Sequence, residues 1–219
     1  METHLKPHLY EEIPSCWSDF FPIYDEAVAT APPGSILIEV GSFWGKSACY
    51  LAEAAKLADK QLRVYCVDPW AANPSNNPGM FDKAHGEAGH IEPQVHAQHH
   101  DSLFCAFAYF VERTGLSPDP LRVMRMESLE AADMFAGMKR RGGDIHFIFL
   151  DGDHDYSYVI QELRAWGPLI ARRGMIAGHD WTDEFAGVKQ AVTEYAHIDL
   201  EDEMRISVEC GRSWVLRPR

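Results

Sequence analysis

The chain has 219 residues, 46% of them hydrophobic and 24% charged, which is the balance of one ordinary globular domain. Acidic residues outnumber basic ones by 33 to 20, and the formal net charge is −13. The basic runs Lys139-Arg140-Arg141 and Arg172-Arg173 fall where helices are expected to end. Because a nucleic-acid partner requires clustered Lys and Arg against its phosphates, this composition argues against DNA or RNA.

Membrane and secretory features are not evident in the sequence. Its apolar stretches are shorter than the roughly 20 residues that a membrane span needs, and residues 1–10 lack the apolar region of a signal peptide. The five cysteines include no CxxC pair, which argues against a zinc knuckle or a thioredoxin-like motif. We therefore expect a cytoplasmic protein that does not associate with membranes.

Apolar runs alternate with segments of helical periodicity along the chain. Residues 1–34 are predicted to form an N-terminal helical segment, and strands are predicted at 35–40, 61–67, 121–126, 145–150 and from Met175. Helices are predicted at 47–57, from Leu103, at 159–170 and from Val188, and a closing strand pair at 205–209 and 213–216. This alternation predicts an α/β fold over residues 1–219 as a single domain: a mostly parallel seven-stranded sheet with helices on both faces and a C-terminal antiparallel strand pair.

Residues 71–101 interrupt this rhythm. The segment contains an Asn/Pro-rich stretch and the histidines His85, His90, His96, His99 and His100. It is too long for a routine connection, so we interpret it as an insertion that forms a lid over the ligand-binding edge. The histidines match no standard zinc spacing, although a metal site remains an alternative.

A glycine-containing loop follows the first predicted strand, in the sequence Glu39-Val40-Gly41-Ser42-Phe43-Trp44-Gly45-Lys46-Ser47. Its two glycines permit a sharp turn and a close approach of a ligand to the main chain, and the helix after it begins with free N–H groups. The Gly-Lys-Ser ending invites a P-loop interpretation, but Gly41 leaves the loop one residue short of that motif. A nucleotide-binding protein of the P-loop kind is therefore an alternative, not the favoured interpretation.

Asp68 ends the second predicted strand. An acid at this position can accept two hydrogen bonds from a ribose diol, as in dinucleotide-binding folds. It lies 27 residues after Gly41, somewhat beyond the spacing of about 20 that is typical there. Combined with the glycine loop, Asp68 indicates a nucleoside ligand.

Acids and histidines follow the fourth and fifth predicted strands. Asp151, Asp153 and His154 come on one turn after the fourth strand, and His179 and Asp180 end the fifth. If these strands are neighbours, Asp151, His179 and Asp180 can converge on one divalent ion, for which two carboxylates suit Mg²⁺ or Mn²⁺. In the alternative interpretation, Asp151 or Asp153 caps the next helix and His179 is an ordinary hydrogen-bonded histidine.

The loop sequence Glu39-x-Gly41-x-x-x-Gly45-x-Ser47 resembles motif I of the class I S-adenosylmethionine-dependent methyltransferases, and the resemblance extends over about residues 36–216. It implies a Rossmann-like fold that binds S-adenosyl-L-methionine with the loop residues, including Ser42, and with Asp151. In that family Asp68 would hold the ribose hydroxyls. The segment with Glu127 and Ser128, after the third strand, would lie against the adenine.

Asp151-Gly152-Asp153-His154, followed by Gly178-His179-Asp180-Trp181, resembles a branch that includes macrocin-type and cephalosporin-hydroxylase-like small-molecule O-methyltransferases. The resemblance implies that Asp151 and Asp180 are ligands of a divalent metal, with Mg²⁺ favoured. His179 departs from the branch, whose members carry an acid there. His154 corresponds to a general base in some members, and Asp153 is the competing candidate.

We therefore expect metal-assisted O-methylation of a hydroxyl on a small-molecule acceptor, in a pocket that Trp70 and Trp181 help to shape. A metal-dependent hydroxylase is an alternative, since His154, His179 and Asp180 supply the two histidines and one carboxylate of a non-haem iron site. A nucleotide-binding module without catalysis is a further alternative. The acceptor cannot be identified from the sequence, and a homo-oligomer is compatible with it.

Overall fold

The computed structural model describes residues 8–13, 18–70, 103–139, 144–200 and 203–219. The predicted insertion at 71–101 lies outside the described residues. The helical elements are η1 (Leu9–Glu12), α1 (Phe21–Thr30), α2 (Lys46–Leu57), α5 (Leu103–Thr114), α6 (Ser128–Lys139), α7 (Tyr156–Trp166), η2 (Gly167–Leu169), α8 (Ala186–Glu194) and η3 (Tyr195–Asp199). The strands are β1 (Ile36–Val40), β2 (Arg63–Val67), β3 (Leu121–Met124), β4 (Ile145–Leu150), β5 (Ile170–Gly178), β6 (Met204–Glu209) and β7 (Ser213–Pro218).

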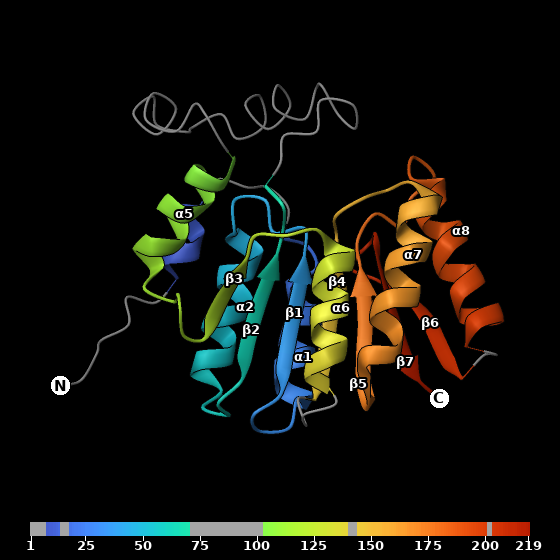
Figure 1. Ribbon diagram of the computed structural model, residues 1–219, viewed down its shortest axis with the longest axis horizontal. Coiled ribbons are helices and arrows are strands. Elements are labelled where there is room, and N and C mark those ends of the chain that lie inside the picture. Colours follow the sequence, from blue (N-terminus) through green and yellow to red (C-terminus); the bar gives the residue numbers. More distant parts are fainter. Residues whose placement is uncertain (1–7, 14–17, 71–102, 140–143, 201–202) are drawn as a thin grey trace.

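The strands form one seven-stranded sheet in the order β3-β2-β1-β4-β5-β7-β6 (Figure 1). The first five strands in sequence pair in parallel, whereas β7 is antiparallel to both β5 and β6. The predicted α/β fold, with its mostly parallel sheet and its closing antiparallel pair, is thereby confirmed. β4 pairs directly with both β1 and β5, so the three strands that precede the polar loops are neighbours.

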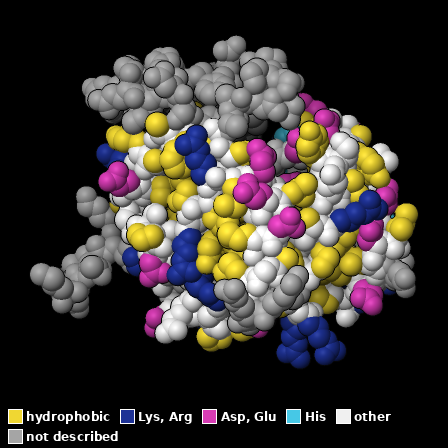
Figure 2. All heavy atoms as spheres, viewed as in Figure 1, with side chains coloured by type: hydrophobic (Ala, Val, Ile, Leu, Met, Phe, Trp, Pro, Cys, Tyr) yellow, Lys and Arg dark blue, Asp and Glu magenta, His cyan; other side chains and the backbone are white. Residues whose placement is uncertain are grey.

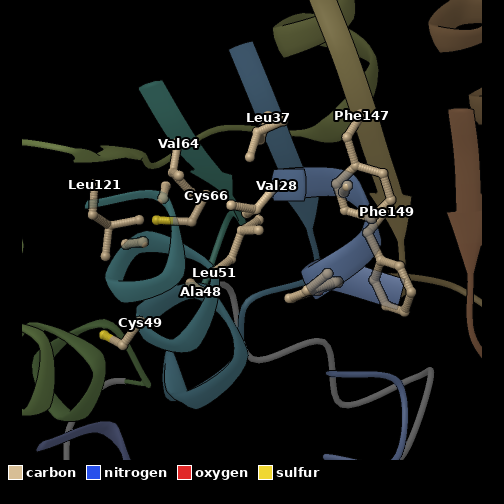
Figure 3. Close-up of a cluster of buried hydrophobic side chains, with 14 of the residues drawn as sticks. Val28, Leu37, Ala48, Cys49, Leu51, Val64, Cys66, Leu121, Phe147 and Phe149 are labelled. Carbon is tan, nitrogen blue, oxygen red and sulfur yellow. The ribbon is translucent and has the colours of Figure 1, made fainter. Parts of the chain in front are cut away.

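Helices cover both faces of the sheet because alternate strand residues point to opposite sides. Leu37 of β1 and Phe147 of β4 face a cluster with α1, α2 and α5, whereas Ile38 and Ile148 face a cluster with α6, α7 and α8. Figure 3 shows part of the first cluster, in which Phe149 lies beside the N-terminal helix α1. All residues of β1 and β4 are buried, as expected for strands covered on both faces.

Three details differ from the sequence-based expectations. Ile170 was expected in the helix that starts before Val159, but α7 ends at Trp166 and Ile170 begins β5. Pro168, in the short turn η2, cannot donate a helical hydrogen bond and ends the helix early. The pair Arg172 and Arg173 consequently lies exposed in β5 and not at a helix end, and β3 stops at Met124 instead of Met126.

Side chains from remote parts of the chain fix α1 against the sheet. The Lys60 ammonium donates hydrogen bonds to the carbonyl oxygens of Val28, Ala29 and Ala31, at 3.0, 2.7 and 3.2 Å, and so satisfies the C-terminal end of the helix. Arg217 of β7 contacts Glu26 through its Nε at 2.9 Å and also pairs with Glu209. The N-terminal helix is therefore a fixed part of the domain.

Among the helices that the structure describes, none is both long and apolar enough to cross a membrane.

Candidate active site

The polar residues predicted to form a site lie at one edge of the sheet. β1, β2, β4 and β5 are parallel, so the loops that follow them emerge together at their carboxyl ends, where ligands bind in open α/β sheets (Figure 1). Acidic side chains gather near this edge on the face shown in Figure 2. The edge has two sides: a β1–β2 side with the glycine loop and Asp68, and a β4–β5 side with the acids and histidines.

The glycine loop turns tightly between β1 and α2. The Gly45 N–H donates to the Ser42 carbonyl oxygen at 2.7 Å, and both Gly41 and Gly45 have left-handed backbone angles, with φ of 86° and 88°. Ser42 is buried, and Ser47 lies in the first turn of α2. Trp44 is only 5% exposed and packs into the core against Phe43 and Phe110 of α5. Such a closed turn differs from the wide loop that wraps a phosphate, which weighs against the P-loop alternative.

Asp68 ties this loop to the end of β2. Its Oδ2 accepts a hydrogen bond from the Phe43 N–H at 3.0 Å, and its Oδ1 accepts one from the Trp70 N–H at 2.6 Å. The Trp70 indole N–H in turn donates to the Phe43 carbonyl oxygen at 2.7 Å. Burial raises the pKa of Asp68, while the main-chain N–H groups oppose that rise. Asp68 is thus oriented by main-chain donors at the position expected to face a ribose.

Glu39, the acid of the predicted motif, is buried within β1. Its side chain is 1% exposed, and its Oε2 accepts a hydrogen bond from the hydroxyl of Tyr24, on α1, at 2.6 Å. Burial raises the pKa of Glu39 to about 7, against the opposing effect of the Tyr24 hydrogen bond. The hydroxyls of Ser42 and Ser47 act on this carboxyl in the same direction as Tyr24, although Oε1 makes no hydrogen bond of normal geometry among the described residues. Glu39 thus connects β1 to the glycine loop and to the first turn of α2.

Gly41 brings the two sides of the site into contact. A Cβ atom at this position would overlap the carbonyl oxygen of Asp151, so only glycine allows the loops after β1 and β4 to pack this closely. The Asp151 N–H donates to the Val40 carbonyl oxygen at 2.9 Å, continuing the strand pairing into the loop. The position of Asp151 is therefore set by the glycine loop as well as by β4.

On the β4–β5 side, the structure brings together Asp151, His154, His179 and Asp180, which we call the acid–histidine cluster. His154 Nε2 lies 2.8 Å from Asp180 Oδ2. His179 Nδ1 lies 3.3 Å from Asp180 Oδ1 and 3.9 Å from Asp151 Oδ1. The two histidines therefore face opposite oxygens of the Asp180 carboxylate.

Electrostatics in the cluster separate the two acids. Burial raises the pKa of Asp151 to about 8, although the positive charge of His179 opposes this. Burial acts on Asp180 in the same direction, but hydrogen bonds from His154 and His179 hold its pKa well below the usual range. Burial alone would lower the pKa values of both histidines, and their acidic neighbours raise them instead. Asp180 is thus the stable anion on which both imidazoles are oriented.

The backbone around Asp180 and His154 is closely constrained. Asp180 has φ of 61°, an uncommon angle for a residue with a side chain and one that is often found at functional sites. The His154 ring stacks on Phe185 with centroids 4.3 Å apart, and a Cβ at Gly187 would lie 2.7 Å from the His154 carbonyl oxygen. The start of α8 therefore packs directly against the His154 turn.

Asp153 has a local structural role. Its Oδ1 accepts a hydrogen bond from the Asp155 N–H at 2.8 Å, an Asx-type turn that leads into α7. Asp151, by contrast, faces the cluster, so the alternative in which it merely caps α7 is not supported. Among the described residues, the group whose possible ligand atoms all lie within 4.8 Å of one another is Asp151, His154 and Asp180. His179, predicted as the nitrogen ligand, adjoins this group.

The segment after β3 shows a connection that the sequence did not reveal. Glu127 is exposed, whereas Ser128 begins α6 and its Oγ accepts a hydrogen bond from the Trp166 indole N–H at 3.0 Å. Ser128 in turn donates to Glu162, whose pKa is raised by burial to about 7. Glu162 lines the same small hollow as Asp151 and His154. The sequence feature that could have identified Glu162 is its position: an acid on the apolar face of α7, three residues after Val159.

Two further residues come from the N-terminal segment, which contains no motif that indicates a site. Tyr24 reaches Glu39, as described above, and Asp19 Oδ1 lies 3.3 Å from His179 Nε2. Neither residue belongs to a recognisable motif. Their roles depend on how α1 packs across the sheet, which spacing along the chain does not reveal.

Comparison with known proteins identifies the family of the chain. A family model described as a methyltransferase domain matches residues 38–181. No curated protein sequence matches the chain.

Among solved structures, the O-methyltransferase NovP is 12% identical with a TM-score of 0.60, over 91% of this chain and 79% of NovP. The calicheamicin methyltransferase CalS11 is 13% identical with a TM-score of 0.62, over 97% of this chain and 80% of CalS11. The Podospora anserina methyltransferase PaMTH1, solved with S-adenosylhomocysteine (SAH), is 14% identical with a TM-score of 0.53, over 92% of this chain and 76% of PaMTH1. The chain therefore belongs to the methyltransferase-domain family and has the fold of the class I S-adenosylmethionine-dependent methyltransferases.

Proposed function

We propose that this protein transfers the methyl group of S-adenosylmethionine to a hydroxyl of a small-molecule acceptor, with His154 as the general base. The observation that carries the proposal is the pairing of His154 with Asp180 beside the glycine loop. Methyl transfer requires a base that is held in one orientation next to the donor, and a carboxylate bonded to one ring nitrogen provides that orientation.

The chemistry at the acceptor follows from this pairing. The hydroxyl oxygen attacks the sulfonium methyl in line, the C–S bond breaks, SAH leaves, and the hydroxyl proton passes to His154. Asp180 stabilises the resulting imidazolium through the 2.8 Å contact. His154 is preferred to Asp153 as the base because Asp153 accepts the Asp155 N–H within its own turn.

The cluster also fits a divalent cation. Two carboxylates and an imidazole nitrogen whose ligand atoms lie within 4.8 Å of one another are donors that such ions accept. We propose Asp151 and Asp180 as the residues that would hold it, which leaves His154 for proton transfer. A cation there would polarise the acceptor hydroxyl, lower its pKa and favour the neutral form of His154.

Support for a small-molecule hydroxyl acceptor comes from two sources. NovP is an O-methyltransferase and CalS11 is a calicheamicin methyltransferase, and both share the fold. The chain itself carries a formal charge of −13, which opposes association with a polyanion. The non-haem iron alternative gains no support, since His154 and His179 face opposite oxygens of Asp180.

The decisive experiment combines binding and turnover. Calorimetric titration is expected to show binding of SAH and none of ATP. With methyl-labelled S-adenosylmethionine and pooled metabolites, mass spectrometry is expected to detect a labelled product heavier by one CH₂ group.

The variant His154→Ala should lower turnover roughly 10²–10⁴-fold while SAH binding is retained. The exposed His197, on η3, gives the control His197→Ala, which should behave as wild type. Excess EDTA should abolish turnover. ATP binding without SAH binding would refute methyl transfer, and full activity in EDTA would refute only the metal.

A further inference from the structure

The N-terminal segment contributes a carboxylate to the site from outside the part of the chain that defines the family. The family model matches residues 38–181, whereas Asp19 lies just before α1. Asp19 Oδ1 nevertheless lies 3.3 Å from Nε2 of His179, the ring whose other nitrogen faces the two acids of the cluster. His179 therefore has carboxylates on both of its nitrogens.

His179 itself is well placed to act as a support. Its side chain is 4% exposed, so the ring cannot exchange its partners for water. Phe20 packs edge-on against it at a centroid distance of 5.3 Å, and Phe20 also packs on Phe149 of β4 at 4.6 Å. Phe20 thus packs against the ring, and Asp19 is the acid that faces its Nε2.

The segment that carries Asp19 is held firmly. Tyr24, one turn further along α1, bonds Glu39 in β1, and Lys60 and Arg217 fix the rest of the helix. Among the described residues, Asp19 is the acid within ion-pair distance of His179 Nε2. The contact is an ion pair and not a hydrogen bond, because Nε2 makes no hydrogen bond among the described residues. A carboxylate that faces the far nitrogen of a histidine still favours one orientation of the ring, and outer partners of this kind also orient the groups that hold a metal.

We propose that Asp19 is a positioning residue of the active site. It holds the His179 ring so that Nδ1 faces the Oδ1 atoms of Asp151 and Asp180, which fixes both carboxylates for a divalent cation. This inference rests on the metal-assisted function proposed above. It adds a residue to the site that neither the matched segment nor the sequence motifs contain.

The test measures metal affinity directly. Mn²⁺ is titrated into the full-length protein and free Mn²⁺ is followed by its electron paramagnetic resonance signal, with SAH affinity and the melting temperature measured in parallel. The variants are Asp19→Asn, which keeps the size but removes the charge, and Asp19→Glu, which restores the charge. Asp25→Asn is the matched control, because Asp25 is an exposed acid of α1 whose Oδ1 accepts the Tyr50 hydroxyl and not a residue of the acid–histidine cluster.

We expect Asp19→Asn to weaken Mn²⁺ binding roughly 10- to 100-fold, Asp19→Glu to recover part of that loss, and Asp25→Asn to match wild type. SAH affinity and melting temperature should stay unchanged in all three variants. Because Asp19 is 41% exposed, the Asn substitution should leave folding intact.

Wild-type Mn²⁺ affinity in Asp19→Asn would overturn the inference, and so would an equal loss in Asp25→Asn or a loss that follows the melting temperature. Wild-type protein that binds SAH but no Mn²⁺ would overturn it as well, while leaving methyl transfer standing. Absence of SAH binding would instead count against the proposed function.

Discussion

The β1–β2 side of the site and its β4–β5 side differ in what holds their polar groups in place. On the first side, Asp68 accepts hydrogen bonds from the main-chain N–H groups of Phe43 and Trp70, and the loop closes on its own carbonyl at Ser42. On the second side, side chains orient one another, as Asp180 does for His154.

This difference separates binding from chemistry. Main-chain donors cannot change protonation state, so the groups that orient Asp68 stay the same over a wide pH range. Side chains that orient one another can exchange protons, which the β4–β5 side requires to accept a proton from the acceptor. This difference can be tested at two kinds of residue: those at which the two sides touch, and those that are not held in the way typical of their own side.

The largest effect is expected where the two sides touch. Gly41→Ala would place a methyl group on the Asp151 carbonyl oxygen and force alanine to φ of 86°. The left-handed strain and the overlap together should cost roughly 3–5 kcal/mol in the free energy of unfolding. Urea denaturation followed by circular dichroism measures this change.

Gly34→Ala is the matched control for that variant. Gly34 also has a positive φ, of 77°, but a Cβ there meets no atom within 4 Å. It should therefore lose only the strain, about 1–2 kcal/mol. Equal losses at the two glycines would show that the close contact between the two sides carries no energetic weight.

Glu39 lies on the β1–β2 side but differs from Asp68, because the Tyr24 side chain and not a main-chain N–H group binds it. Its pKa is about 7 in the native state against 4.5 for an unperturbed glutamate, so the native state binds its proton more tightly. The stability from protonated Glu39 is present below pH 4.5 and is lost as the pH rises through 7. Removing the charge should abolish this loss.

Urea titrations at pH 5 and pH 8 test this with Glu39→Gln, which still accepts the Tyr24 hydroxyl. Relative to wild type, the variant should gain roughly 2–3 kcal/mol between the two pH values. Other buried acids, such as Asp151, titrate in both proteins, so the difference isolates Glu39. Parallel pH profiles would mean that Glu39 keeps an ordinary pKa in the native state.

The smallest effect should come from Asp68. Asp68→Asn replaces one acceptor oxygen with a donor group in a site whose neighbours are N–H donors. Loss of hydrogen bonds to a charged acceptor should weaken SAH binding about 10-fold or somewhat more, as measured by calorimetry. Asp59→Asn, at an exposed acid on the loop before β2, should bind SAH as wild type does. Unaltered affinity in Asp68→Asn would remove Asp68 from the cofactor contacts.

Much of the fold could be predicted because each buried strand is a short apolar run next to a helical repeat. The parallel sheet and the closing pair follow from that alternation, and all seven strands lie near their predicted positions. The error at Ile170 shows the limit of periodicity. Its spacing from Trp166 suits a helix, but Pro168 ends α7 and the residue begins β5.

The site was predictable to the extent that its residues follow strands. Asp151 and Asp180 meet because the strands before them are neighbours, as the rule about carboxyl ends implies. Which histidine contacts which oxygen depends on the turn after β4 and on the left-handed angle at Asp180, neither of which has a signature in the sequence. The contact of Asp19 with His179 could not be predicted from the sequence, because it depends on how α1 packs across the sheet.

The anchoring of α1 has a consequence for anyone who recombines domains of this kind. Lys60, in the loop before β2, and Arg217, in the last strand, both bind α1, so the N-terminal helix is held to the sheet by residues from the middle and the end of the chain. A chimera that transplants only residues 38–181, the segment matched by the family model, would carry the glycine loop and the acids but would lack both α1 and β7. Such grafts should therefore be cut outside both partners of the Glu26–Arg217 pair.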